Sequence, residues 1–491
     1  MASRNFRSFK SDESFLKKIA IGAIGTKRVY DDLTAQGHRP IELERGSMSF
    51  KIWKAIKIKR LRVPDILCVD CGTRVESRAK TKMEITMSHS LSDPERGWDF
   101  GLNDDDFVAL VLCMKSGDRP IDWQPSDLVQ YIAVSDLRRA FRQGHVHQGR
   151  PKGAEEGFES RITWPASVAS SDGIISEIND TRIKFKRLHD NRTISLPLDR
   201  KGVRLQPLVN VGEHISQSQI IAAVVPVFFQ VPCSHDHSEA HYIELLTSPS
   251  ITERYAAGKA LSYFTLDNAI PILKKTINDD RDHIYVRLEA AATLMRAGQP
   301  EGVSFIETCL HDQYLENRLE AIIVLGEIDN NESCMILSKC LLDDTQHPEI
   351  RAGAAWSLGE LGSRNALDAL IESFHSVENS IRIEAARALA KLTRSYGDEV
   401  LNRFPSSSPE QRPGIAWAIS KAGAAFSVEG LLSACIDDDA RQWVAYIIGT
   451  QEPECYVGQI EALRERDPEI YFAVTVLWKI ITSWINGLEE Y

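Results

Sequence analysis

The sequence lacks several features that define common classes of protein. Its longest apolar run, residues 220–229, is half the roughly 20 residues that a membrane-spanning helix needs, and Pro226 interrupts it. The N-terminus has no apolar segment behind its charged residues, so no secretory signal is expected. The 9 cysteines are an odd number spread widely along the chain, which favours reduced thiols over a disulfide framework. These absences predict a soluble cytoplasmic protein.

Three familiar catalytic motifs are also missing. The sequence contains no Walker-type phosphate loop, no Gly-x-Ser-x-Gly nucleophile elbow and no His-Glu-x-x-His zinc motif. What is present is an ordinary globular composition, 43% hydrophobic and 26% charged over 491 residues. At roughly 150 residues per domain, this length predicts about three domains.

The charge is distributed unevenly along the chain. Residues 1–90 carry 19 Lys and Arg against 10 Asp and Glu, whereas residues 251–491 carry 22 against 37. A basic head joined to an acidic tail indicates an anionic partner at the head, and nucleic acid is the usual candidate. A solvated basic surface without a partner is the alternative.

The C-terminal half repeats with a period near 31 residues. Segments such as Val286–Ala291 and Ile381–Ala386 share one pattern, in which an arginine begins a run of small and apolar residues. These arginines stand at positions 254, 287, 318, 351, 382, 412 and 441. The period predicts stacked helix pairs that bury their apolar faces against one another. The segments resemble HEAT-like repeats.

This resemblance implies an all-α solenoid over residues 233–491 that serves as a scaffold for a protein partner. In HEAT-like repeats the arginine that begins a helix usually bonds between neighbouring units. We therefore expect the seven repeated arginines, here called the arginine ladder, to have a structural role. The acidic charge of this half argues against DNA wrapping around the solenoid.

Residues 151–232 change to an alternation of period two, with turn signals between the runs. Arg182–Leu188 alternates strictly, and His189–Asn191 predicts the turn of a hairpin. The spacing resembles the barrel-sandwich folds that carry biotin or lipoyl groups. No lysine stands at a hairpin tip with the flanks that such carriers use, so an interaction module or a spacer is the interpretation.

Residues 1–150 are predicted to form an α/β domain. Pro64-Asp65 begins one predicted strand, and Glu76 follows on the next strand of the same hairpin. With a helix before them, these residues resemble the restriction-endonuclease-like PD-(D/E)xK superfamily. The whole chain is thus predicted to be a multidomain α+β protein with a nuclease-like head, a small all-β barrel-sandwich-like domain and a HEAT-like solenoid.

The resemblance implies that Asp65 and Glu76 hold Mg²⁺ or Mn²⁺ through carboxylate oxygens, beside a cation near the scissile phosphate. A strict match places lysine two residues after the acid, but here that residue is Arg78, which does not act as a base. Lys80 lies on the same strand face, roughly 6–7 Å further along. The candidate catalytic residues are therefore Asp65, Glu76, Lys80 and Arg78.

A basic run precedes this hairpin and indicates a surface for nucleic acid, with DNA favoured over RNA. It contains Trp53 among its cations, which are Lys51, Lys54, Lys57, Lys59, Arg60 and Arg62. Neutralising several phosphates makes binding strongly dependent on salt. The alternative is an edge strand that its lysines protect against aggregation.

Cys68 and Cys71 form a Cys-x-x-Cys pair followed by a glycine, which is a knuckle found in structural zinc sites. The sequence holds no second pair of this kind, and Cys113 or His89 completes a site only if the fold brings them close. Buried thiols are therefore favoured over zinc here. A separate group near residue 240, formed by Cys233, His235, His237 and His241, is interpreted as a polar linker.

The leading hypothesis is a metal-dependent nuclease whose acidic solenoid docks a protein partner, a layout suited to prokaryotic antiviral defence or DNA processing. The alternative is a non-enzymatic adaptor or assembly scaffold with a degenerate nuclease fold. Arg78 in the place of lysine favours the adaptor, and the Pro64-Asp65 to Glu76 spacing favours the enzyme.

Overall fold

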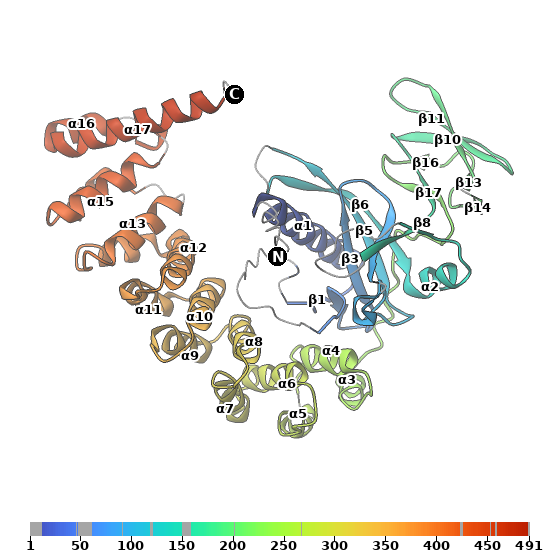
Figure 1. The fold of residues 1–491 in the computed structure, drawn as a ribbon, viewed down its shortest axis with the longest axis horizontal. Coiled ribbons are helices and arrows are strands. Elements are labelled where there is room, and N and C mark those ends of the chain that lie inside the picture. Colours follow the sequence, from blue (N-terminus) through green and yellow to red (C-terminus); the bar gives the residue numbers. More distant parts are fainter. Residues whose placement is uncertain are drawn as a thin grey trace, which may run out of the picture. The chain divides into compact units, whose positions relative to one another are not determined.

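The computed structural model describes residues 12–45, 47, 61–90, 92–117, 121–149, 159–200, 202–266, 268–422, 426–451, 453–456 and 459–489. They divide into two compact units, the first ending at Ala269 and the second beginning at Ile270 (Figure 1). The division into three domains at residues 1–150, 151–232 and 233–491 stays a prediction from the sequence. The helices in the described ranges include none that is both long and apolar enough to span a bilayer.

The first unit is built on a mixed five-stranded sheet with the order β1-β2-β3-β5-β6. Its strands are β1 (Pro40–Glu42), β2 (Ile66–Cys68), β3 (Arg74–Lys80), β5 (Phe107–Lys115) and β6 (Trp123–Ala133). Strands β1, β2 and β3 are antiparallel neighbours, β5 runs parallel to β3, and β6 is antiparallel to β5. The first helix, α1 (Asp12–Ala35), packs against this sheet (Figure 1).

The sequence explains why α1 lies so close to β3. Alternation along the strand directs Val75 and Ala79 into the apolar core that α1 covers, and Arg74, Glu76, Arg78 and Lys80 to the opposite face. Gly25 makes the approach possible, because a Cβ atom there would lie 2.5 Å from Cβ of Ala79. The face of β3 that carries the charged residues is therefore fixed by helix packing.

A second, three-stranded sheet and a short helix pack beside the first sheet. The sheet has the order β4-β8-β7, from β4 (Ile85–Ser90), β8 (Glu159–Trp164) and β7 (His147–Gln148), and the helix is α2 (Val134–Arg142). Buried Trp164 and Trp98 meet edge to face, with 4.9 Å between ring centroids, and Trp164 donates a hydrogen bond to the carbonyl of Leu137 in α2. This core holds β4 beside the end of β3.

The predicted barrel-sandwich segment forms two open sheets, and its described strands do not close into a barrel. One sheet has the order β12-β11-β10-β16 and the other β15-β17-β9, with the short pair β13-β14 beside them. The strands are β9 (Ala166–Val168), β10 (Gly173–Ile178), β11 (Arg182–Arg187), β12 (Thr193–Pro197), β13 (Asp199–Arg200), β14 (Val203–Arg204), β15 (Gln206–Pro207), β16 (His214–Ile215) and β17 (Ile220–Ala223). Both sheets contribute to one core around Phe185 and Ile221. The hairpin predicted at residues 189–191 is confirmed between β11 and β12.

The rest of the chain is helical. The first unit ends with α3 (Glu239–Leu245) and α4 (Ile251–Leu261). The helices that follow are α5 (Ala269–Ile277), α6 (Ile284–Arg296), α7 (Pro300–Cys309), α8 (Leu315–Leu325), α9 (Asn331–Leu342), α10 (Pro348–Leu361), α11 (Leu367–Glu372), α12 (Asn379–Arg403), α13 (Arg412–Lys421), α14 (Val428–Ser433), α15 (Asp438–Gly449), α16 (Ile460–Arg466) and α17 (Pro468–Glu489). One row of the second unit stacks α6, α8, α10, α12, α13, α15 and α17 in succession, which confirms the predicted solenoid of helix pairs.

The arginine ladder is structural along most of this row, as predicted. Nε of Arg287 donates to the carbonyl of Ile277 at 3.0 Å, and Nε of Arg351 donates to that of Leu341 at 2.8 Å. Each bond satisfies a carbonyl at the end of the preceding helix. Arg412 instead binds two aspartates near the start of α15, whereas Arg382 is exposed and bonds only locally, to Asn379.

Candidate functional site

Two carboxylates, those of buried Asp65 and half-buried Glu76, lie opposite each other on the β2–β3 hairpin. The antiparallel register pairs Ile66 with Val75, and its extension by one residue places Asp65 opposite Glu76. Oδ2 of Asp65 accepts a 2.7 Å hydrogen bond from the backbone N–H of Ser77. Asp65 is 8% exposed and the Glu76 side chain 15%. The structure therefore brings together the two acids that the sequence singled out.

Electrostatics disfavour two negative charges at this position. Burial, followed by the nearby charges of Glu76 and Glu44, raises the pKa of Asp65 well above its usual range. Burial also raises the pKa of Glu76, against the opposing effect of Arg78 and Arg62. A divalent cation beside the pair would remove this penalty, because it stabilises both carboxylates in their ionised form.

The two candidate cations take different positions. Nη2 of Arg78 lies 2.9 Å from Oε1 of Glu76 and forms an ion pair with it. Nζ of Lys80 instead donates to the carbonyl and the hydroxyl of Thr86 on β4, at 2.5 and 3.1 Å. Burial, followed by the charge of Arg78, lowers the pKa of Lys80 to about 8. Arg78 thus contacts Glu76 of the carboxylate pair directly, and Lys80 is bonded to the neighbouring strand.

A cavity of about 430 Å³ adjoins these cations within the first unit. Its wall is formed by α1, the end of β3, β4 and β8. Five of the lining side chains are basic, namely Lys18, Arg78, Lys80, Lys82 and Arg161, and one, Glu84, is acidic. This excess of positive charge suits an anionic ligand such as a phosphate group.

Most of the predicted basic run, from Lys51 to Arg60, lies outside the described residues. Arg62 at its end is described and exposed, and it lies near enough to Glu76 to affect the pKa of that carboxyl. A role for the run in binding nucleic acid therefore stays a prediction.

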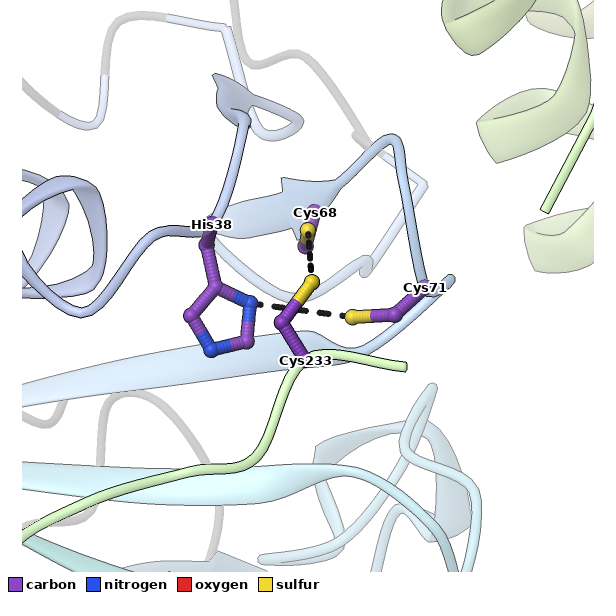
Figure 2. A group of neighbouring side chains, drawn as sticks. All are labelled: His38, Cys68, Cys71 and Cys233. Atoms are coloured by element: carbon purple, nitrogen blue, oxygen red, sulfur yellow. Dashed lines mark hydrogen bonds between the residues drawn. The ribbon is translucent and has the colours of Figure 1, made fainter. Parts of the chain in front are cut away.

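A second group of candidate metal ligands lies at the turn of the same hairpin. His38, Cys68, Cys71 and Cys233 each offer one ligand atom, and these four atoms lie within 4.8 Å of one another (Figure 2). His38 belongs to the turn between α1 and β1, Cys68 ends β2, Cys71 lies in the β2–β3 turn, and Cys233 follows β17. The hydrogen bond between Cys68 and Cys71 lowers the pKa of Cys71 and raises that of Cys68.

The ligands that the sequence suggested for Cys68 and Cys71 were wrong. Cys113 is buried in the sheet core, with its sulfur 3.9 Å from the carbonyl of Ile21, and Nδ1 of His89 accepts a hydrogen bond from the backbone N–H of Trp98. Cys233, one of the four ligands, comes from the group near residue 240 that the sequence analysis interpreted as a polar linker. His38 carried no signal in the sequence, because a lone histidine after a helix matches no ligand spacing.

Comparisons with known proteins concern the helical repeats. The family described as HEAT repeats matches residues 304–390. Deoxyhypusine hydroxylase of Mus musculus is 27% identical over 104 residues, which are 21% of this chain and 34% of that protein. The chain thus spans about a third of the length of this curated relative.

Solved structures match over similar shares of the chain. The human deoxyhypusine hydroxylase structure covers 45% of this chain and 85% of its own, at 18% identity and a TM-score of 0.20. The complex of CpcE and CpcF of phycocyanin lyase from Nostoc sp. PCC7120 covers 51% of this chain and 96% of its own, at 18% identity and a TM-score of 0.25. An archaeal HEAT-like repeats protein from Thermococcus onnurineus covers 44% of this chain and 97% of its own, at 15% identity and a TM-score of 0.23. The C-terminal region therefore contains HEAT repeats, which the family match places at residues 304–390.

Proposed function

We propose that the first unit binds nucleic acid and hydrolyses a phosphodiester bond with the help of a divalent metal. The observation that carries this proposal is the opposition of Asp65 and Glu76, together with the ion pair between Glu76 and Arg78, which is one of five basic side chains that line a cavity in the same unit. The order of one helix, one strand and a hairpin, formed by α1, β1, β2 and β3, supports it further, since this order accords with the PD-(D/E)xK resemblance noted in the sequence.

The donor set fits magnesium or manganese. Mg²⁺ is commonly held by one or two carboxylates and completes its shell with water and substrate phosphates. Asp65 and Glu76 supply two such carboxylates, and Glu44 lies near enough to affect the pKa of Asp65. When bound, the metal would activate water and polarise the phosphate. Arg78 and Lys80 would stabilise the negative charge on the phosphate oxygens.

The HEAT repeats would act as the scaffold for a protein partner. Stacked repeats present an extended surface, and residues 251–491 carry a large excess of acidic over basic side chains. We therefore expect a basic protein surface to bind there. A place in prokaryotic antiviral defence or DNA processing rests on the pairing of the two regions alone.

One observation favours a second function, that of a nucleic-acid-binding adaptor without catalysis. Arg78 occupies the position of the catalytic lysine and forms an ion pair with Glu76, while Lys80 is bonded to Thr86. Neither cation is then free to act as a base in this arrangement. The adaptor would bind phosphates through the same cavity and leave them intact.

A cleavage assay separates the two functions. Linear, supercoiled and single-stranded DNA, and RNA, are incubated with the purified protein and Mg²⁺ or Mn²⁺. Asp65→Asn and Glu76→Gln preserve the shape of each side chain and remove its charge. Asp180→Asn, at an exposed turn of the β segment, is the matched control.

The nuclease proposal predicts metal-dependent cleavage that falls at least 100-fold in both site variants and is unchanged in the control. Binding without cleavage, weakening steeply as salt is raised, would support the adaptor instead. Cleavage that persists in Asp65→Asn and Glu76→Gln would contradict the site assignment.

A further inference from the structure

We propose that His38, Cys68, Cys71 and Cys233 hold one structural zinc ion. Three thiolates and one imidazole form a ligand set that zinc adopts in closed structural sites, with all four positions filled by protein. The four side chains are buried or half-buried, and they converge from three separate segments of the first unit (Figure 2).

Two of the six distances between the donor atoms match a zinc tetrahedron, and all six are within 4.8 Å. With Zn–S bonds of about 2.3 Å and a Zn–N bond of about 2.0–2.1 Å, tetrahedral geometry places two sulfurs about 3.8 Å apart and a sulfur and a nitrogen about 3.5–3.6 Å apart. Sγ of Cys68 lies 3.8 Å from Sγ of Cys233, and Sγ of Cys71 lies 3.6 Å from Nδ1 of His38. A disulfide requires about 2.05 Å between sulfurs, so the Cys68–Cys233 pair is far from that bond.

The surroundings of His38 favour the same conclusion. Its Nε2 lies 2.8 Å from the carbonyl of Val231, an acceptor that fixes the proton on Nε2 and leaves the lone pair of Nδ1 directed at the sulfurs. A zinc-bound histidine commonly donates its other N–H to a backbone carbonyl in this way. The carbonyl comes from the same chain segment as Cys233, two residues before it.

The turn of the hairpin is shaped for this arrangement. Gly72, directly after Cys71, has a φ of +68°, and a Cβ atom there would lie 2.6 Å from Nε2 of His237. The amide of His237 donates to the carbonyl of Asp70, and the hydroxyl of Tyr242 donates to that of Val69 at 2.8 Å. These bonds hold the segment that carries Cys233 against the turn.

The zinc would join this hairpin to the α1–β1 turn and to the segment that leads into α3. Asp65 precedes Cys68 by three residues, and Glu76 follows Cys71 by five, so the metal would clamp the hairpin on which both carboxylates lie. Its role is thus structural, and it does not depend on whether the carboxylates catalyse a reaction.

Metal analysis of the full-length protein tests the site. Protein purified without chelator should contain about one zinc per chain by elemental mass spectrometry. Cys71→Ser and Cys233→Ser should reduce this to less than a tenth, and His38→Ala should at least weaken retention against a chelator. Cys455→Ser, which removes an exposed thiol of the second unit, should leave the zinc content unchanged.

Thiol labelling of the unaltered chain provides a readout that does not require the variants to fold. Cys68, Cys71 and Cys233 should resist alkylation until a zinc chelator is added, whereas Cys455 should react at once. Replacement by Co²⁺ should give the absorption of a tetrahedral thiolate complex. A chain with less than a tenth of an equivalent of zinc that also fails to bind Co²⁺, or a Cys68–Cys233 disulfide in the freshly purified protein, would overturn the proposal.

Discussion

The ion pair between Arg74 and Asp106 offers the sharpest test of how the first unit is held together. Nε and Nη2 of Arg74 lie 2.9 and 2.6 Å from the two carboxylate oxygens of Asp106, and the side chains are 4% and 5% exposed. Asp106 also accepts a 2.6 Å bond from the backbone N–H of Asn103. The pair joins the start of β3 to the turn before β5.

Asp106→Ala would leave the guanidinium of Arg74 buried without its charged partner, with a 3.4 Å bond to the hydroxyl of Thr252 remaining. Removal of one member of a buried, hydrogen-bonded pair costs about 3–5 kcal/mol, because the remaining charge stays desolvated. The double substitution Arg74→Met with Asp106→Leu removes both charges and keeps the volume. This double variant should recover most of the stability that Asp106→Ala loses, since apolar residues often replace a buried ion pair at little cost in free energy.

Hydrogen exchange followed by mass spectrometry measures this loss in the unit concerned. At about 1.36 kcal/mol per factor of ten, the predicted cost corresponds to exchange about 150-fold to 5,000-fold faster for protected amides of β3 and β5. Amides of α10 in the second unit are the internal control and should keep their rates. An acceleration below about 10-fold, or a double variant as unstable as Asp106→Ala, would refute the reasoning.

Three further outcomes are expected. Gly72→Ala should lower both the melting temperature and the zinc content, because the left-handed backbone and the ring of His237 oppose a Cβ atom; retention of both would contradict the role of the turn. In the solenoid, Arg351→Ala should lower the free energy of unfolding, measured with urea, by about 1–3 kcal/mol, because it leaves the buried carbonyl of Leu341 unsatisfied. The control Arg382→Ala, at an exposed arginine, should change this free energy by less than about 0.5 kcal/mol. Without divalent metal, stability should fall as the pH rises above about 4, because the raised pKa values of Asp65 and Glu76 mean that the folded state binds more protons than the unfolded state. Mg²⁺ should raise the melting temperature more at pH 8 than at pH 5.5, and equal shifts would count against metal binding by these carboxylates.

Local patterns in the sequence were sufficient to predict the repeated helices and the β2–β3 hairpin. Repetition near 31 residues gave the stacked helices, since each pair must cover the apolar face of its neighbour. Alternation along Arg74–Lys80 placed Glu76, Arg78 and Lys80 on one face of a strand, because the side-chain period of a strand is two. The hairpin between Asp65 and Glu76 followed from the same rules, and the structure has it with the two acids opposed.

Contacts between distant segments were decided only by the tertiary structure. Lys80 shares its strand face with Arg78, but packing of β4 beside β3 gives its ammonium group a partner in Thr86 that no spacing could reveal. The strands of the β segment form open sheets, because closure into a barrel depends on pairing between strands that the sequence leaves unspecified. The pair Cys68 and Cys71 was visible as a half-site. His38 and Cys233 are 30 and 165 positions away from Cys68 in the sequence, and only the folding of α1, the hairpin and the segment after β17 into one unit brings their ligand atoms within reach.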